Sequence, residues 1–134
     1  MMHRTMLSIA LCLAIGTLCL TSCGKRQKTA ESSGLAERSQ QFVDLLAKGD
    51  FETAAAGFNS TMKQAMPAQK LREAWLSLTG QFGAFKRQAG VRTAKEQGFD
   101  VAYVTCEFEK GSASVKVVWD RAGQVGGLWV VPPS

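Results

Sequence analysis

The sequence predicts an α+β domain in which N-terminal helices pack on one face of a curved four-stranded antiparallel sheet. Two observations carry this prediction. Apolar residues recur with a helical period in the first half of the chain, and after Gly83 they alternate with the period of two that is typical of strands. The 134 residues, 46% of them hydrophobic and 20% charged, suffice for one globular domain and a short additional segment.

The first element along the chain is a predicted signal peptide, residues 1–22. His3 and Arg4 form a short polar start, and an apolar run follows over residues 6–20. This run has about the length of the apolar region of a secretory signal, and it is shorter than the ~20 apolar residues that a spanning helix needs. A membrane anchor helix that stays on the chain is the alternative, which a glycine and a threonine within the run disfavour.

The end of this run matches the cleavage motif of bacterial lipoproteins. In Leu20-Thr21-Ser22-Cys23, an aliphatic residue and two small residues precede a cysteine. Small residues let the extended chain enter the lipoprotein signal peptidase, which would cut between Ser22 and Cys23 after the thiol has received diacylglycerol. Several acyl chains on Cys23, palmitate among them, would then anchor the protein far more firmly than one chain.

This motif also predicts where the protein resides. We expect a membrane-anchored lipoprotein of the bacterial cell envelope that faces the periplasm or the cell exterior. Gly24 follows the cysteine, and by similarity to Gram-negative lipoproteins the absence of aspartate there favours the outer membrane. Residues 23–34 are polar and lack an apolar period, so they predict a lipidated cysteine and a flexible tether ahead of a domain over residues 35–133.

Cleavage would remove several groups that carry chemistry. His3 is the only histidine, and Cys106 is the only cysteine beyond Cys23, so the mature chain would have no His-based nucleophile pair, no His-based metal site and no intramolecular disulfide. The sequence contains no nucleophile elbow, P-loop or dinucleotide motif. The net charge of +5 is spread along the chain, which disfavours nucleic acid as a partner. We therefore expect no cofactor and no metal, and favour a protein that is not an enzyme.

Three helices are expected in the first half of the domain, starting at Leu35, Asp50 and Pro67. The first ends at Lys48, before a glycine. Asp50 is a typical N-cap for the second, and proline suits the first turn of the third, which buries a stripe through Trp75.

Four strands are expected to follow, over residues 84–96, 99–109, 112–120 and 124–131. A two-residue loop at Lys110-Gly111 would place Cys106 opposite Val115. A turn at residues 120–123 would place Trp119 opposite Val125 and Val115 opposite Trp129. These turns would put ten apolar residues on one buried face: Ala102, Val104, Cys106, Phe108, Val115, Val117, Trp119, Val125, Trp129 and Val131.

This order of elements resembles the NTF2-like (cystatin-like) α+β roll and, more narrowly, the DUF3887 family. The resemblance is carried by FVDLLAKGDFETAAAGFNSTM, by the Trp75 helix leading into GQFGAF, by VTCEFEKG and by VVWDRAGQVGGLWVVPP. It covers residues 35–133. In that family the domain often stands behind a signal or ahead of a separate hydrolase domain. Such rolls host enzymes, ligand binders and interaction modules, so the fold alone does not imply an activity.

The resemblance also implies a candidate pocket, because such rolls commonly bind small apolar molecules at their open mouth. The candidate lining residues are Phe58, Met62, Arg72, Trp75, Trp119 and Trp129. Arg72 at the mouth would orient an acidic ligand. An ordinary filled core is the favoured alternative, and we expect Cys106 to pack there rather than act as a reactive thiol.

The opposite face of the sheet is more apolar than a solvated face requires, so we expect a homodimer or an envelope protein partner there. The candidate interface residues are Val101, Tyr103, Val118, Leu128 and Val130. Glu107 and Glu109 lie on one side of a strand beside a hairpin, where solvated carboxylates are more common than an acid/base pair or a cation site.

Our leading expectation is an envelope lipoprotein whose non-catalytic domain binds a partner protein or a small ligand. The alternative is a small pocket enzyme, or an accessory module of an envelope hydrolase, that uses a carboxylate such as Asp100 or Glu107 as a base. A third hypothesis is a structural component of an envelope complex.

Overall fold

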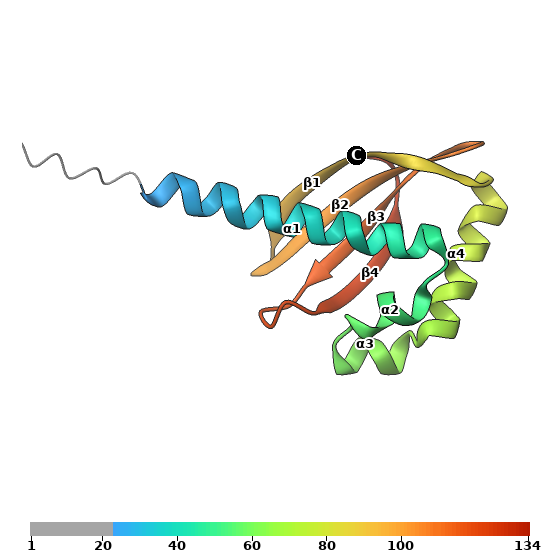
Figure 1. The fold of residues 1–134 in the computed structure, drawn as a ribbon, viewed down its shortest axis with the longest axis horizontal. Helices are drawn as coiled ribbons and strands as arrows, with labels where there is room; N and C mark the ends of the chain where they lie inside the picture. Colours follow the sequence, from blue (N-terminus) through green and yellow to red (C-terminus); the bar gives the residue numbers. More distant parts are fainter. Residues whose placement is uncertain (1–22) are drawn as a thin grey trace, which may run out of the picture.

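A computed structural model describes residues 23–134, and the predicted signal peptide lies outside the described residues. Figure 1 shows helices on one side of a sheet, with the first turns of the first helix projecting past the sheet edge. The helices are α1 (Cys23–Lys48), α2 (Phe51–Ala56), α3 (Ser60–Ala65) and α4 (Ala68–Phe82). The strands are β1 (Phe85–Glu96), β2 (Phe99–Phe108), β3 (Gly111–Trp119) and β4 (Val125–Val131). The predicted α+β class is confirmed.

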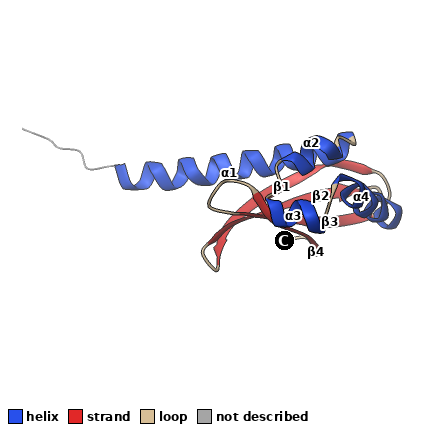
Figure 2. Ribbon diagram, turned by 90° about the horizontal axis from the view of Figure 1, so that it is seen from below, coloured by secondary structure: helices blue, strands red, loops and turns tan. Residues whose placement is uncertain are grey.

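Helix α1 is longer than the sequence predicted. It begins at Cys23, so the residues expected to form a flexible tether lie in the helix, and the start expected at Leu35 falls well inside it. The segment contains no proline and several good helix formers. Its lack of an apolar stripe suits a helix that projects beyond the domain, as Figures 1 and 2 show. Residues 23–34 are therefore helical although they lack an apolar period.

The two short helices, α2 and α3, each begin after a residue whose side chain caps the helix N-terminus. Asp50 caps α2 as predicted, since its carboxylate accepts a hydrogen bond from the Thr53 N–H at 3.2 Å. Asn59 caps α3 in the same way, accepting from the Met62 N–H at 2.9 Å. Helix α3 is additional to the three helices that the sequence predicted. Pro67 precedes α4, which ends at Phe82 before the glycine cap Gly83, where φ is +83°.

The strands form an antiparallel meander in the order β1-β2-β3-β4. Phe108 pairs with Gly111 around a two-residue loop, and Cys106 pairs with Ala113 rather than with the predicted Val115. The predicted register between β2 and β3 is therefore wrong by two residues. Because side chains alternate with a period of two, this error leaves the same residues on the buried face.

The pairing of β3 with β4 differs from the prediction in a way that changes which face some side chains lie on. Trp119 pairs with Val125 as expected, but the register then shifts between Val118 and Trp119, and Lys116 rather than Val115 pairs with Trp129. One extra residue in β4 reverses the orientation of every side chain after it. Trp129 and Val131 were predicted on the buried face, and the register places both on the opposite face.

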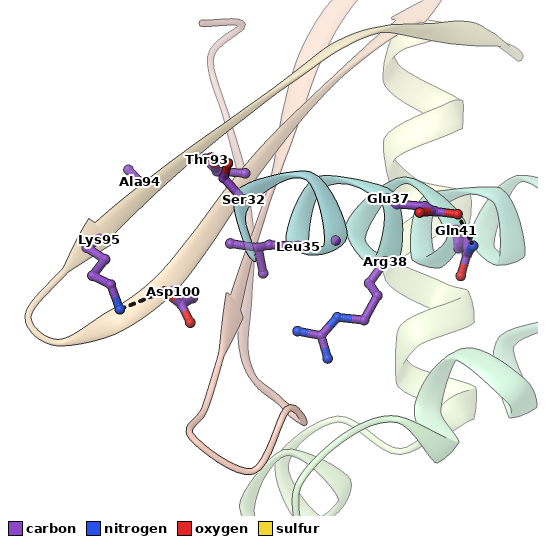
Figure 3. Close-up of a pocket in the computed structure, with 10 residues that line it drawn as sticks. Ser32, Leu35, Glu37, Arg38, Gln41, Thr93, Ala94, Lys95 and Asp100 are labelled. Atoms are coloured by element: carbon purple, nitrogen blue, oxygen red, sulfur yellow. Dashed lines mark hydrogen bonds and ion pairs between the residues drawn. The ribbon is translucent and has the colours of Figure 1, made fainter. Parts of the chain in front are cut away.

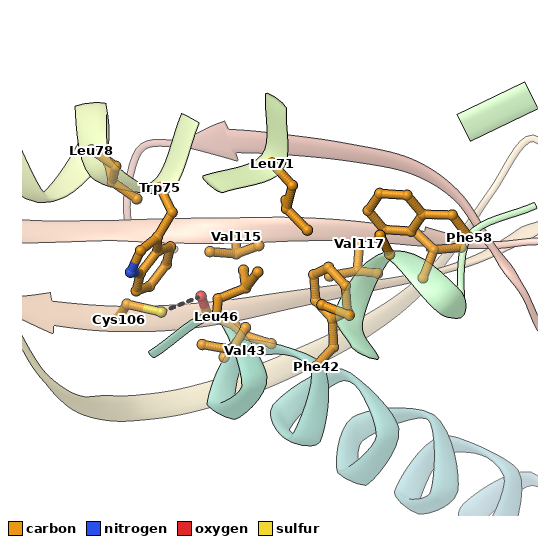
Figure 4. Packing of buried hydrophobic residues seen from close by; sticks show 14 of the residues in the cluster. Phe42, Val43, Leu46, Phe58, Leu71, Trp75, Leu78, Cys106, Val115 and Val117 are labelled. Atoms are coloured by element: carbon orange, nitrogen blue, oxygen red, sulfur yellow. Dashed lines mark hydrogen bonds between the residues drawn. The ribbon is translucent and has the colours of Figure 1, made fainter. Parts of the chain in front are cut away.

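The core lies between the helices and the face of the sheet that they cover, here called the inner face (Figure 4). It contains Phe42, Val43 and Leu46 of α1, Leu71, Trp75 and Leu78 of α4, and Cys106, Val115 and Val117 of the sheet. The Cys106 side chain is fully buried, as predicted, and burial raises the pKa of its thiol to about 12. It therefore stays protonated and packs as a small apolar group.

Candidate functional site

The interior of the domain is filled at the place of the candidate ligand pocket, which agrees with the filled core that the sequence favoured over a pocket. Phe58, Met62, Trp75 and Trp119 are all buried members of the hydrophobic core. Figure 4 shows Phe58 and Trp75 surrounded by other core side chains. The two remaining candidates lie elsewhere, with Arg72 exposed on α4 and Trp129 exposed on β4. The structure does not bring the six candidate pocket residues together.

An open cleft of about 910 Å³ lies between α1 and the turn that joins β1 to β2 (Figure 3). Arg38 extends from α1 into this cleft, and its guanidinium lies 4.6 Å from the centre of the Trp119 ring. The Trp119 indole N–H donates to Ser39 Oγ at 2.9 Å, and Ser39 Oγ donates to the Leu35 carbonyl at 2.8 Å. The Arg38 guanidinium is thus a cation held at the side of the cleft by its contact with the Trp119 ring.

The two carboxylates that line the cleft, Asp100 and Glu37, each interact with a neighbouring side chain. Asp100 lies 3.0 Å from Lys95 Nζ, and its side chain is 47% exposed. Glu37 accepts a hydrogen bond from the Gln41 amide at 3.4 Å. A carboxylate general base is usually tuned by burial away from cations. Asp100 is instead half-exposed and paired with a lysine.

The other candidate base, Glu107, is also ion-paired. Arg87 binds it in a bidentate manner, through Nε at 2.8 Å and Nη2 at 3.1 Å. The Glu109 carboxylate accepts a hydrogen bond from the Ala84 N–H at 3.3 Å. The two carboxylates therefore have different partners and form no acid/base pair. Among the side chains that the structure describes, no group of three His, Cys, Asp or Glu residues is placed to hold a metal.

A row of four side chains lies on the outer face of the sheet, the face that the helices do not cover. The C-terminal Ser134 lies over another part of this face, where its N–H donates to Ser114 Oγ at 3.2 Å and its carbonyl accepts from Thr105 Oγ1 at 3.4 Å. Arg92, Tyr103, Lys116 and Trp129 are successive register partners on β1, β2, β3 and β4. Cations and aromatic rings alternate along this cation–aromatic row. Arg92 lies 4.1 Å from the centre of the Tyr103 ring, and Lys116 lies 5.6 Å from that ring and 5.7 Å from the Trp129 ring. All three distances lie within the range of cation–π interactions.

Glu96 fixes the middle of the row. Its carboxylate accepts hydrogen bonds from the Tyr103 hydroxyl at 2.5 Å and from Lys116 Nζ at 3.3 Å. The hydrogen bond from Tyr103 is the main cause that lowers the pKa of Glu96, and the hydrogen bond to Glu96 raises the pKa of Lys116. Both groups are therefore charged at neutral pH, and the row carries two cations beside one carboxylate.

Trp129 is the most exposed aromatic side chain of the row, at 54%. Its ring folds back over Gly127, so closely that a Cβ atom at residue 127 would lie 2.4 Å from ring Cζ3. The glycine therefore provides the space in which the ring rests on the main chain. The sequence missed this arrangement because the extra residue in β4 places Trp129 on the outer face.

The predicted interface residues divide between the two faces. The register places Val101, Tyr103 and Val118 on the outer face, where Val101 is buried and the other two are half-buried. Leu128 packs against the core and so lies on the inner face, which corrects the prediction. Val130 pairs with the core residue Val115 and is 52% exposed at the sheet edge. The structure thus places three of the five residues on the outer face, together with Trp129.

Residues 39–128 match the model of a protein family described as a protein of unknown function, DUF3887. The chain belongs to the DUF3887 family. The match covers the fold from the second half of α1 to the middle of β4, and it includes three of the four residues of the cation–aromatic row. The resemblance to DUF3887 that the sequence predicted is confirmed.

This DUF3887 chain is also similar to Esterase EstD of Thermotoga maritima. The two are 31% identical over 88 residues, which are 66% of this chain and 21% of the esterase. The chain therefore spans about a fifth of that relative's length. No solved structure matches the chain. Between Cys23 and Ser134, no helix is long and apolar enough to cross a membrane.

Proposed function

We propose that this DUF3887 protein is a lipid-anchored binding module of the bacterial cell envelope, and that it holds a partner protein on the outer face of its sheet. The cation–aromatic row carries the proposal, because it is ordered by its own contacts and yet exposed at both ends, at Arg92 and Trp129. Tryptophan and arginine are enriched among the residues that dominate binding energy at protein interfaces. The filled interior leaves the predicted ligand pocket without space.

The anchor is proposed at Cys23, where the lipoprotein motif of residues 20–23 ends. Helix α1 begins at the same residue. At a rise of about 1.5 Å per residue, the part of the helix before Leu35 would separate the domain from the acyl chains by roughly 18 Å. We also assign the fold to the NTF2-like rolls, in which helices cover one face of a curved sheet.

Lipid labelling tests the anchor. Cells that produce the full-length chain are labelled with radioactive palmitate, and the Cys23→Ala variant is compared with the parent. The parent is expected to carry label and to run at the processed size, whereas the variant stays unlabelled and unprocessed. Normal processing of the variant would overturn the lipoprotein assignment.

Photo-crosslinking in intact cells tests the binding surface. A photo-reactive amino acid replaces Arg92 on the outer face in one full-length variant and the exposed Lys70 of α4 in a control. Irradiation is expected to join the first variant, and not the control, to a defined envelope protein. Absence of any adduct at position 92, or equal adducts at both positions, would contradict binding at the outer face.

The similarity to part of Esterase EstD favours a second candidate, an accessory domain that acts beside a hydrolase. In that case the partner identified at position 92 is itself a hydrolase. The chain alone is then expected to release no product from p-nitrophenyl acetate above the background rate. Hydrolysis that disappears in the Asp100→Asn or Glu107→Gln variant would instead support the small pocket enzyme.

A further inference from the structure

We propose that the free edge of β4 pairs with β4 of a second copy of the chain. The two strands would run antiparallel about a two-fold axis at Trp129, so that two four-stranded sheets join into one continuous sheet. This pairing goes beyond the proposed function and does not depend on the lipid anchor. It rests on the state of the β4 edge, its charge, its register and its continuity with the cation–aromatic row.

Strand β4 is the last strand of the sheet, and among the described residues its free edge is bonded to another segment at its first residue, with Asn59 also lying close to Gly126. The Val125 N–H donates to the Gly57 carbonyl, and the Val125 carbonyl accepts from the Asn59 N–H. Main-chain groups alternate in direction along a strand, and the extra residue after Val125 shifts that alternation by one. The N–H and C=O groups of Leu128 and Val130 therefore point to the open edge, ready to pair with another strand.

The two edges of the sheet differ in charge. The other edge strand, β1, contains Lys86, Arg87, Arg92, Lys95 and Glu96. Strand β4 contains no charged residue, and its sequence is VGGLWVV. Edge strands are usually protected from pairing by charged side chains, above all lysine. The cationic β1 edge is protected against its own copy, whereas β4 meets no like charge when it pairs with itself.

The orientation of the side chains limits the possible registers, and we place the two-fold axis at Trp129. Directly opposite residues of an antiparallel pair lie on the same face, so Trp129 must meet an outer-face residue of the second copy. A two-fold axis at Trp129 places it opposite the second Trp129, and places Leu128 opposite Val130 on the inner face. Each pair is apolar. Pro132 and Pro133 follow the strand and, because proline has no N–H, they end the pairing.

In this register the two tryptophans form a non-hydrogen-bonded pair, the kind in which opposite side chains approach closest. Cross-strand aromatic pairs are among the stabilising contacts of a sheet. The cation–aromatic row then continues across the axis, from Arg92 of one copy to Arg92 of the other. The two Lys116 side chains lie three strand spacings apart, roughly 14 Å, which exceeds the Debye length of about 8 Å at physiological ionic strength.

The interface is small, because a two-fold axis at Trp129 pairs five residues of β4 on each side, residues 127–131. Interfaces of this size belong to weak, transient complexes. Confinement of both copies to one membrane raises their effective concentration, so a weak contact suffices there. This last point alone rests on the proposed lipid anchor.

Disulfide trapping in intact cells tests the pairing. The full-length chain is made with Trp129→Cys, and a mild oxidant is added before non-reducing electrophoresis. Val130→Cys is the register control and Leu76→Cys on α4 the position control, since these parent side chains have similar exposures of 54%, 52% and 54%. The parent chain, with its own cysteines, controls for background. A disulfide dimer is expected for Trp129→Cys in clear excess over all three controls.

A second measurement keeps the tryptophan in place. Sedimentation of the full-length lipoprotein in detergent is expected to show a monomer–dimer equilibrium that Val130→Lys weakens roughly tenfold or more, while Leu76→Lys leaves it unchanged. A monomer at every concentration, equal trapping at positions 129 and 76, or trapping of a different protein at position 129 would each overturn the proposal. Palmitate labelling is unaffected by these outcomes and is judged separately.

Discussion

The indole ring of Trp129 lies against the main chain at Gly127, in a space that even one added methyl group would fill. This contact holds an exposed aromatic ring in one orientation at the end of the cation–aromatic row. The ring is therefore positioned before any partner arrives, which lowers the entropic cost of binding to it.

The first prediction concerns this contact. Gly127→Ala is expected to displace the Trp129 ring and to destabilise the domain by about 1–3 kcal/mol, since the new Cβ cannot coexist with the ring. Near-ultraviolet circular dichroism reports the ring, and urea unfolding reports the stability. Gly90→Ala in β1 is the matched control, because a Cβ there meets nothing within 4 Å. Equal effects at both glycines would contradict the close contact.

The second prediction concerns the buried hydrogen bond from Trp119 to Ser39. Ser39→Ala leaves the indole N–H without a protein partner and is expected to cost about 1–3 kcal/mol of unfolding free energy. Ser39→Ala combined with Trp119→Phe should cost less than the sum of the two single changes, because the phenylalanine has no donor to satisfy. Strict additivity in urea unfolding would show that the bond contributes nothing.

The third prediction uses the pKa of Cys106, which burial raises from its usual value of 9.0 to about 12. Between these values the unfolded chain loses the thiol proton and the folded chain keeps it, so stability falls as the pH rises. The difference in stability between the parent and Cys106→Ala should therefore shrink from pH 8 to pH 11. A constant difference across this range would mean that the folded thiol ionises normally.

The fourth prediction concerns the hydrogen bond from Tyr103 to Glu96, which is the main cause that lowers the pKa of Glu96. Tyr103→Phe keeps the ring and removes the donor, so the pKa of Glu96 should rise toward its ordinary value. Because a lowered pKa stabilises the folded state at neutral pH and ceases to do so in acid, the variant should lose less stability on acidification than the parent. Carboxyl chemical shifts in an NMR titration measure the change. A larger rise in Lys116→Met would reverse the assigned order of causes.

The sequence predicted the fold class and the strand order because both depend on periodicity, which tolerates small errors. The two-residue register error at Cys106 changed no face. The single extra residue in β4 changed the face on which Trp129 lies. The sequence did not predict this extra residue, because Gly126 and Gly127 are also compatible with a regular strand. The cation–aromatic row depends on that one residue.

The candidate site was predicted less well than the fold for a related reason. The candidate pocket came from the family resemblance, and the sequence favoured a filled core instead. Aromatic bulk alone does not distinguish a core from a cavity, and the buried Trp75 belongs to the core. Tyr103 was placed on the outer face correctly. Its partners Arg92 and Glu96 lie on β1. Two register shifts in β1 break the simple alternation of side chains between the faces, so the pairing of β1 with β2 could not be read from the sequence.

The most direct test of binding at the outer face repeats the crosslinking with the photo-reactive residue at position 92 and a second, charge-removing change. Lys116→Gln removes the central cation of the row, and Arg72→Gln removes the cation once expected at a pocket mouth. The account predicts that Lys116→Gln abolishes the adduct while Arg72→Gln leaves its yield unchanged. Loss of the adduct in Arg72→Gln with full retention in Lys116→Gln would contradict it.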